Sequence, residues 1–201
     1  MTRRALALPC ALAMAVLAGA CTGSSVARYL DVPGQSSHPL TADGRYGFGI
    51  WEHPKGQAYT VSVVVYATHR LRAHIESVRP VARSSNIEVL GSLAAGPERH
   101  FGQAGGSHGF PPANLPRWAA TTYRPVRQVV VTTRKVDGLD GVDLLIGIRL
   151  RSGHRGWIDG IEVTFVVEGK RYAGRFPVSA GLCDYHPCPM PAFGPPWDGA
   201  P

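Results

Sequence analysis

Two stretches of the sequence decide its fold class, LLIGIRLR at residues 144–151 and IEVTFVVEGKRYAGRFPV at residues 161–178. In the first, large aliphatic residues occupy every second position up to Leu150. In the second, apolar residues alternate with Glu and Thr up to Val167, and Glu168-Gly169 then forms a two-residue turn that reverses the chain. A period of two residues is typical of a β-strand that buries one face. The two stretches therefore predict three half-buried strands, the last two joined as a hairpin.

Further short strands are expected upstream of these stretches. They are marked by alternation or by runs of β-branched residues, and they cover Tyr46–Trp51, Tyr59–Ala67, Leu71–Val78, Ile87–Leu93 and Val126–Thr133. Turn residues separate them, since the chain contains 24 Gly and 17 Pro, and no long amphipathic helix pattern occurs. About eight short strands without helices predict an all-β fold, a two-sheet antiparallel sandwich of immunoglobulin-like topology. A small barrel is the alternative.

The first residues have the layout of an export signal. Arg3 and Arg4 give a basic start, the run from Ala5 to Ala20 is apolar and uncharged, and small residues precede Cys21. The apolar run is shorter than the ~20 residues that a membrane-spanning helix needs. The segment is therefore expected to direct export and to be removed.

The end of this segment, Leu17-Ala18-Gly19-Ala20-Cys21, resembles the signal of bacterial lipoproteins. It departs from that pattern at Ala18, where the family prefers Leu. The resemblance implies that residues 1–20 are cleaved and that Cys21 carries lipid, which would hold the chain on the cell membrane outside the cytoplasm. An ordinary secretory signal with Cys21 left free and an uncleaved anchor are the alternatives. Thr2-Arg3-Arg4 also half-matches a twin-arginine export signal.

Changes in composition along the rest of the chain predict its division into a tether, a domain and a tail. Residues 21–43 are rich in Ser, Gly and Pro and are expected to form a flexible tether, and residues 44–182 form the sandwich domain. A Gly/Pro-rich loop at 95–117 interrupts the domain, and residues 183–201 form a Cys/Pro-rich tail. Loops of this length are usually either functional or disordered. This one is expected to be pinned by its Phe side chains or to bind a ligand through its aromatic and imidazole groups. Its candidate residues are His100, Phe101, His108 and Phe110.

The net charge is +7, and removal of the two arginines in the signal leaves +5. The basic residues are scattered and form no nucleic-acid-binding motif, so nucleic acid is excluded as a partner. The charge is expected to serve solubility alone. The alternative for an exported basic domain is attraction to anionic lipid headgroups or acidic wall polymers.

Four cysteines are present. Cys10 leaves with the signal and Cys21 is the lipidation site, which leaves Cys183 and Cys188. Because exported proteins fold in an oxidising compartment, these two are predicted to form a disulfide.

The same segment offers a second interpretation. Cys183, His186 and Met190 resemble the copper-ligand loop of cupredoxins, since thiolate, imidazole and thioether groups suit copper. The chain departs from that family because no upstream His is followed by Asn and because a Pro-rich tail follows Met190. Cys188 also falls inside the loop. A looser copper or zinc site made of Cys183, His186, Cys188 and Met190 therefore stays open as the alternative to the disulfide.

Asp137, Asp140 and Asp143 lie in a Gly-rich segment. Their spacing matches no known calcium loop, so they are expected to be solvated turn residues, with calcium binding as the alternative.

No catalytic motif is present: the sequence lacks a Gly-x-Ser-x-Gly elbow, a His-Glu-x-x-His pair and a phosphate loop, and no enzyme is predicted. The signal, the composition and the strand pattern together resemble uncharacterised lipoproteins of high-GC actinobacteria. The resemblance implies an address and a fold but no assigned activity. The first hypothesis for the function is a membrane-anchored, non-enzymatic binding or accessory module that engages an envelope protein or wall polymer and needs no cofactor. A copper- or zinc-handling protein is the alternative.

Overall fold

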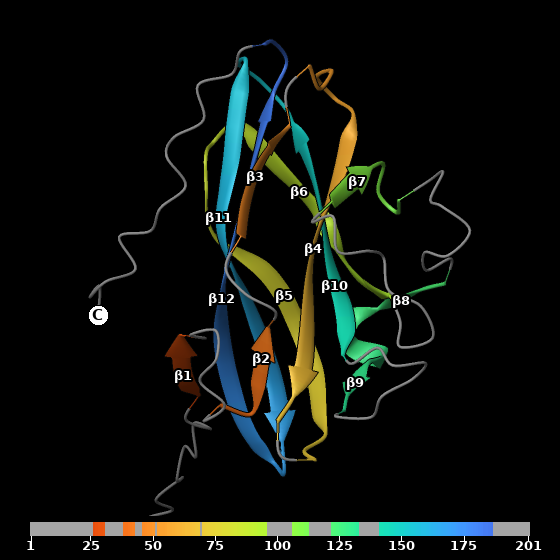
Figure 1. Ribbon diagram of the computed structural model, residues 1–201, viewed down its shortest axis with the longest axis vertical. Helices are drawn as coiled ribbons and strands as arrows, with labels where there is room; N and C mark the ends of the chain where they lie inside the picture. Colours follow the sequence, from red (N-terminus) through yellow and green to blue (C-terminus); the bar gives the residue numbers. More distant parts are fainter. Residues whose placement is uncertain are drawn as a thin grey trace, which may run out of the picture.

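Two β-sheets packed face to face form the body of the protein (Figure 1). The computed structural model describes residues 26–30, 38–42, 46–50, 52–68, 70–95, 106–112, 122–132 and 141–186. In these ranges every regular element is a strand except η1 (Val126–Gln128), a short 3-10 helix. The described residues include no helix with the length and apolar character needed to cross a bilayer.

The first sheet, sheet A, has the strand order β1-β12-β11-β5-β9, and β3 also pairs with β12. Its strands are β1 (Ala27–Leu30), β3 (Tyr46–Ile50), β5 (Ala73–Arg83), β9 (Val130–Val131), β11 (Arg155–Val167) and β12 (Lys170–Cys183). The pairs β1–β12 and β3–β12 are parallel, whereas the other pairs are antiparallel.

The second sheet, sheet B, has the order β2-β4-β10-β6-β8, and β7 also pairs with β4. Its strands are β2 (Leu40–Ala42), β4 (Ala58–Ala67), β6 (Ile87–Ala95), β7 (Gly106–His108), β8 (Tyr123–Pro125) and β10 (Val142–Leu150). All its pairs are antiparallel.

The strand order is that of an immunoglobulin-like sandwich. If β2, β4, β5, β6, β10, β11 and β12 are lettered A to G in chain order, sheet B reads A-B-E-D and sheet A reads G-F-C. This is the arrangement of constant-type immunoglobulin domains. The predicted fold class is therefore confirmed, with two parallel pairs at β12 as a refinement. No described strand pairs across the two sheets, so the small barrel was the wrong alternative.

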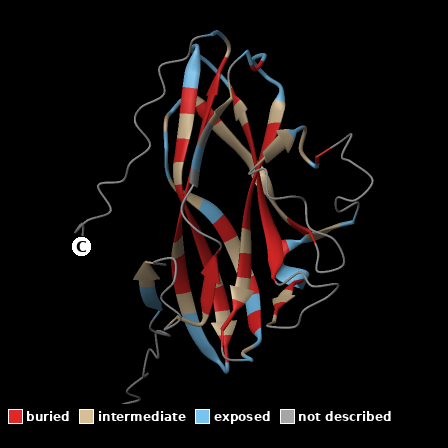
Figure 2. Cartoon of the chain, in the orientation of Figure 1, coloured by how far each residue is buried: buried red, intermediate tan, exposed pale blue. Residues whose placement is uncertain are grey.

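Side chains from alternate positions of both sheets fill the core, which Figure 2 shows as buried residues along the strands. The inward sets predicted from the sequence are confirmed: in β10 they run from Leu144 to Leu150, and in β11 from Ile161 to Val167, each at every second residue. Val61, Val63 and Val65 of β4, which lies beside β10 in sheet B, belong to the same core. Complete burial of a large apolar side chain contributes about 1.5–3 kcal/mol, so these sets fix the registers of the central strands.

The β11–β12 hairpin also has the predicted turn. Glu168 has a φ of 48° and Gly169 a φ of 77°. Positive φ at both central residues defines a type I′ turn, whose twist matches that of the strands. We call the end of the sandwich that carries this turn the lower end, and the end that carries Cys183 the upper end, as they appear in Figure 1.

The tether predicted for residues 21–43 is wrong for two segments within it. Residues 27–30 form β1, which pairs with Tyr172–Arg175, and residues 40–42 form β2, which pairs with Val65–Ala67. The Tyr29 hydroxyl donates a hydrogen bond to the Leu40 carbonyl oxygen at 2.9 Å, so the two segments are held together. These two segments are too short to show a clear alternation, so the sequence did not predict them as strands. They are ordered by their pairing with the longer strands β12 and β4.

The strand predicted at Val126–Thr133 is only partly formed. Residues 126–128 form η1, closed by a hydrogen bond from the Val129 amide to the Val126 carbonyl at 3.1 Å, and only β9 follows. The turn directs Val126, Val129 and Val131 all into the core. A run of valines indicates burial, but it does not distinguish a strand from a turn of three residues.

The Gly/Pro-rich loop contains a docking point on the outer face of sheet B. In it, β7 pairs with β4, and Gly109 bridges to Pro112. The Phe110 ring lies against Gly147 so closely that a Cβ built there would overlap it, and a Cβ on Gly91 would lie 3.7 Å from the same ring. Phe110 thus pins the loop, as predicted, while His100 and Phe101 lie outside the described residues.

We expect Phe110→Ala to destabilise the domain by about 2 kcal/mol, because it removes a half-buried aromatic ring from its seat on the sheet. Gly147→Ala should also destabilise it, because the new methyl group displaces the same ring. Urea unfolding of both single variants and of the double variant measures the coupling. Since one contact is lost in every case, the double variant should cost clearly less than the sum. Additive effects would show that Phe110 does not rest on Gly147.

Candidate functional site

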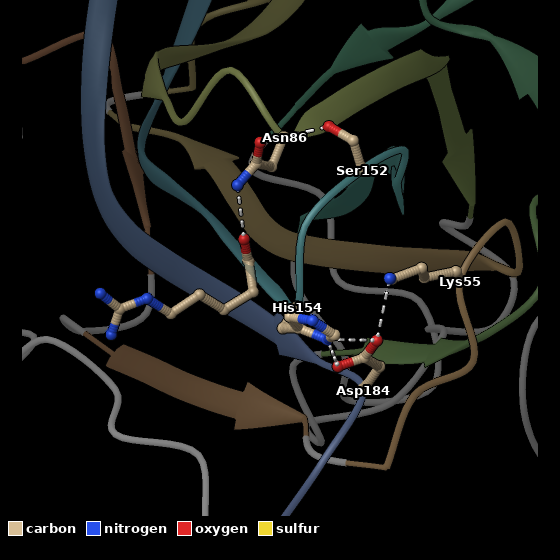
Figure 3. Close-up of polar contacts among 6 residues, drawn as sticks. Lys55, Asn86, Ser152, His154 and Asp184 are labelled. Atoms are coloured by element: carbon tan, nitrogen blue, oxygen red, sulfur yellow. Dashed lines mark hydrogen bonds and ion pairs between the residues drawn. The ribbon is translucent and has the colours of Figure 1, made fainter.

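Polar side chains from separate loops meet at the upper end of the sandwich (Figure 3). Three connections contribute: residues 52–57 before β4, residues 84–86 between β5 and β6, and residues 151–154 between β10 and β11. The end of β12 adds residues 183–186. Backbone hydrogen bonds join them, from His53 N to Cys183 O at 2.8 Å and from Asp184 N to His154 O at 3.1 Å.

Asp184 is the centre of the first group. Its oxygens lie 3.1 and 3.2 Å from His154 Nδ1, and Lys55 Nζ lies 3.4 Å from Oδ2 (Figure 3). Partial burial raises the pKa of Asp184, but the hydrogen bonds and charges of His154 and Lys55 outweigh it, so the net pKa is lowered. The carboxyl group is therefore ionised at neutral pH and accepts the Nδ1 hydrogen of His154.

Asn86 positions the loop that carries His154. Its side-chain amide donates to the Arg155 carbonyl at 3.1 Å and accepts from the Ser152 hydroxyl at 3.2 Å (Figure 3). Gly153 has a φ of 69°, and a Cβ there would lie only 2.8 Å from the Asn86 nitrogen. The turn thus requires glycine both for its backbone conformation and for the close approach of Asn86.

His53 is the centre of a second, aromatic group. It is 1% exposed, its Nε2–H donates to the Gln57 carbonyl at 3.0 Å, and its Nδ1 has no hydrogen-bond partner among the described residues. The His108 ring stacks on it at 5.5 Å between centroids, and Tyr59 packs edge-on against both rings. Burial lowers the pKa of His53, the hydrogen bond that it donates to the Gln57 carbonyl opposes this, and the nearby His108 adds to the lowering. His53 is therefore neutral at pH 7.

The first group presents a cation, an imidazole and an aromatic ring at the surface, whereas His53 of the second group is buried. His154 is 74% exposed and Lys55 is 44% exposed in their side chains, and Tyr185 packs edge-on against His154 at 6.2 Å. A His–Asp pair can serve as a base, but no Ser or Cys side chain forms a hydrogen bond with His154 in the described part of the chain. An exposed imidazole, an ammonium group and an aromatic ring suit recognition of a polar or acidic ligand.

Some of the predicted site residues lie within the described ranges, and others lie outside them. Cys183 is buried at the end of β12 and His186 is exposed three residues on, whereas Cys188, Met190 and the lipidation site Cys21 lie outside the described residues. Both the disulfide and the metal site therefore stay predictions. Within the described ranges, no three His, Cys, Asp or Glu side chains are grouped so that they could hold a metal ion.

Asp143 corrects one expectation. It is fully buried in β10, between β4 and β6, so it is not the solvated turn residue that the Gly-rich context suggested. Asp137 and Asp140 lie outside the described residues.

No sequence pattern marked His53, Lys55, His154 and Asp184 as residues that come together. Asp184 stands next to Cys183, which drew attention to the segment, but its partners come from other loops. His154 is 30 residues away along the chain. No spacing motif marks such a set; the only signal was the concentration of chemically active residues after a strand end.

Comparison with known proteins gives partial structural likeness only. No protein-family model matches the sequence, and neither does any curated protein. The Vibrio cholerae VesB protease is similar at a TM-score of 0.36 and 12% identity over 72% of this chain, which spans 32% of that protease. PapD-like domain 7 of human CEP192 gives a TM-score of 0.31 and 9% identity, with 74% of this chain and 88% of that one covered. The CooA pilin subunit of enterotoxigenic Escherichia coli gives 0.28 and 8%, with 69% and 90% covered.

His154 should control the ionisation of Asp184. We expect His154→Gln to raise the pKa of Asp184 towards its ordinary value, because the variant loses the imidazolium charge, and Lys55→Met to raise it less, because its contact is longer. The carboxyl carbon shift of Asp184, followed by NMR against pH, measures both. Tyr185→Phe is the matched control and should leave the titration unchanged. An equal titration in all variants would contradict the arrangement.

Proposed function

We propose that this chain is a membrane-anchored extracytoplasmic lipoprotein whose sandwich acts as a non-enzymatic binding or accessory module of the cell envelope. Lipid on Cys21 would hold the lower end near the membrane, and the upper end would engage an envelope protein or wall polymer. The observation that carries the proposal is the placement of the first strand and of the polar group around Asp184 at opposite ends of the sandwich.

The placement follows from strand pairing. β1 runs parallel to β12, with Ala27 opposite Tyr172, three residues beyond the turn residue Gly169. The chain therefore enters the fold near the lower end. β12 then runs the length of the sandwich and ends at Cys183, next to Asp184. A 14-residue strand spans about 45 Å at its ordinary rise, so an anchor before β1 leaves the upper end facing away from the lipid.

The upper end has the chemistry of a recognition surface. Lys55 and His154 present polar hydrogens and a positive charge, and Tyr185 adds an exposed ring. Their positions are fixed by Asp184 and Asn86, so little side-chain freedom is lost when a ligand binds. These features support an acidic or hydrogen-bonding partner.

The proposal predicts that the mature protein carries lipid on Cys21. Cys21→Ala should abolish membrane retention of the processed form, because the acylated thiol is what holds the domain. Globomycin, which blocks the lipoprotein signal peptidase, should make the full-length precursor accumulate. Immunoblots of cell fractions and intact-mass analysis of the mature protein measure both effects, and Cys10→Ala is the matched control. An unchanged mature size and membrane fraction in the Cys21 variant would contradict the anchor.

Metal handling by Cys183, His186, Cys188 and Met190 is the second candidate function. The observation in its favour is His53. Its buried Nδ1 has no hydrogen-bond partner within the described ranges, and its backbone amide donates to the Cys183 carbonyl. We favour the disulfide between Cys183 and Cys188, because it would hold the chain after β12 and so fix Asp184 against His154.

Thiol titration separates the two functions. We expect Cys183 and Cys188 to be unreactive in the unfolded, unreduced mature protein, since a disulfide removes both thiolates. Added Cu(I) or Zn(II) should then bind weakly or not at all in isothermal titration. Reduction should release two thiols and lower the melting temperature. Two free thiols together with stoichiometric metal uptake would instead establish the metal-handling function.

A further inference from the structure

We propose that the lower end of the sandwich binds the anionic headgroups of the membrane. Electrostatic attraction then acts together with the lipid anchor to keep this end of the domain toward the membrane. The proposal rests on the proposed function for the presence of the anchor, and it adds a binding surface and a class of partner, anionic lipid. The surface, which we call the basic end, consists of Arg28, Arg70, Arg72 and Lys170.

The four residues share two properties. All are exposed, and none forms a hydrogen bond through its side chain or an ion pair within the described ranges. Long cationic side chains without partners keep their full charge available to a surface, and each basic residue near an anionic membrane contributes attraction that falls off within a Debye length.

Strand pairing brings the four residues to one end. Lys170 begins β12 directly after the Glu168–Gly169 turn, and Arg28 lies opposite Ala173 of the same strand. His74 of β5 lies opposite Val166 of β11. Continuing this register places Arg72, and then Arg70, level with the turn. Figure 2 shows exposed residues at this lower tip.

Other basic residues of the described chain differ in their surroundings. Carboxylates neutralise half of the other described basic residues: Arg79 and Arg175 pair with Glu162, Arg149 with Glu88, Arg171 with Glu76 and Lys55 with Asp184. At the lower end, Glu76 forms an ion pair with Arg171. Among the described residues, Glu168 is therefore the one exposed acidic residue near the basic end. The net charge there is strongly positive.

The length of chain before β1 decides which partner the basic end meets. Six Cα–Cα steps separate Cys21 from Ala27, and a fully extended chain of that length spans at most about 20 Å. A lipid on Cys21 therefore keeps the basic end within about two Debye lengths of the headgroups even at full extension, and shorter conformations bring it into contact. This proximity favours lipid over a wall polymer, which the upper end would meet first.

Vesicle binding by the unlipidated mature chain tests the surface without the anchor. The protein is residues 21–201 with Cys21→Ser, which keeps every residue that the structure describes. We expect it to co-sediment with vesicles of phosphatidylcholine mixed with phosphatidylglycerol, to bind phosphatidylcholine alone weakly, and to lose binding as salt is raised. Replacing Arg70, Arg72 and Lys170 by Gln should weaken binding about 100-fold, from about fivefold for each residue.

The matched control carries the same change of charge at the upper end, with Arg83, Arg151 and Arg155 replaced by Gln. It should bind the mixed vesicles nearly as well as the parent. Equal losses in both triple variants, or equal binding to the two kinds of vesicle, would overturn the proposal. Retention on a soluble acidic wall polymer but not on vesicles would overturn it as well, by assigning the basic end to the polymer.

The result is independent of lipidation. If Cys21 proves unmodified in cells while the vesicle pattern holds, the basic end is supported and the anchor is wrong. If Cys21 is lipidated while the mixed vesicles are not bound, the anchor stands and the basic end is wrong.

Discussion

The antiparallel pairing of β11 with β12 is the contact on which both ends of the molecule depend. The pairing runs from the type I′ turn at Glu168–Gly169 to Arg155 opposite Cys183, with one irregularity between Asp159 and Ile161. Because side chains alternate along the pair, a shift of one residue would turn the apolar set of β11 outward. The same register sets where β12 starts and ends. It thereby places β1 near the turn and Asp184 beside His154 at the other end.

Much of the fold could be predicted because burial leaves a repeating signal in the sequence. The strands of the core and the hairpin followed from a two-residue period, and the inward side chains of β4, β10 and β11 were identified correctly. The short strands β1, β2, β7 and β8 left no such signal, since they are ordered by the edges that they cover. Leu145 shows the limit of the method. It stands at an outward position, yet it is fully buried with Ala95 because Leu93 and Tyr123 pack on it.

The candidate site could not be predicted because its geometry arises between segments that are distant in the sequence. Asn86 holds the turn of His154 by a hydrogen bond to a carbonyl 69 residues away. Lys55 reaches Asp184 from a loop more than a hundred residues earlier. Only the packing of the two sheets against each other brings such loops together, and a sequence pattern of period two contains no information on that packing. The sequence could indicate that the segment after β12 carried chemistry, but not its partners.

The distribution of charge follows from the same architecture. On the outer face of sheet A, Glu162 is 7% exposed and lies between Arg79 and Arg175, the residues opposite it on the two neighbouring strands. Burial raises the pKa of Glu162, but the hydrogen bonds and charges of both arginines outweigh it and the net pKa is lowered. Cross-strand neighbours can compensate one another in this way only within a sheet. The turns at the lower end have no strand on their outer side that could supply a compensating carboxylate. Arg70, Arg72 and Lys170 therefore remain available to a charged surface outside the molecule. The tip formed by the β11–β12 hairpin is thus also where positive charge accumulates.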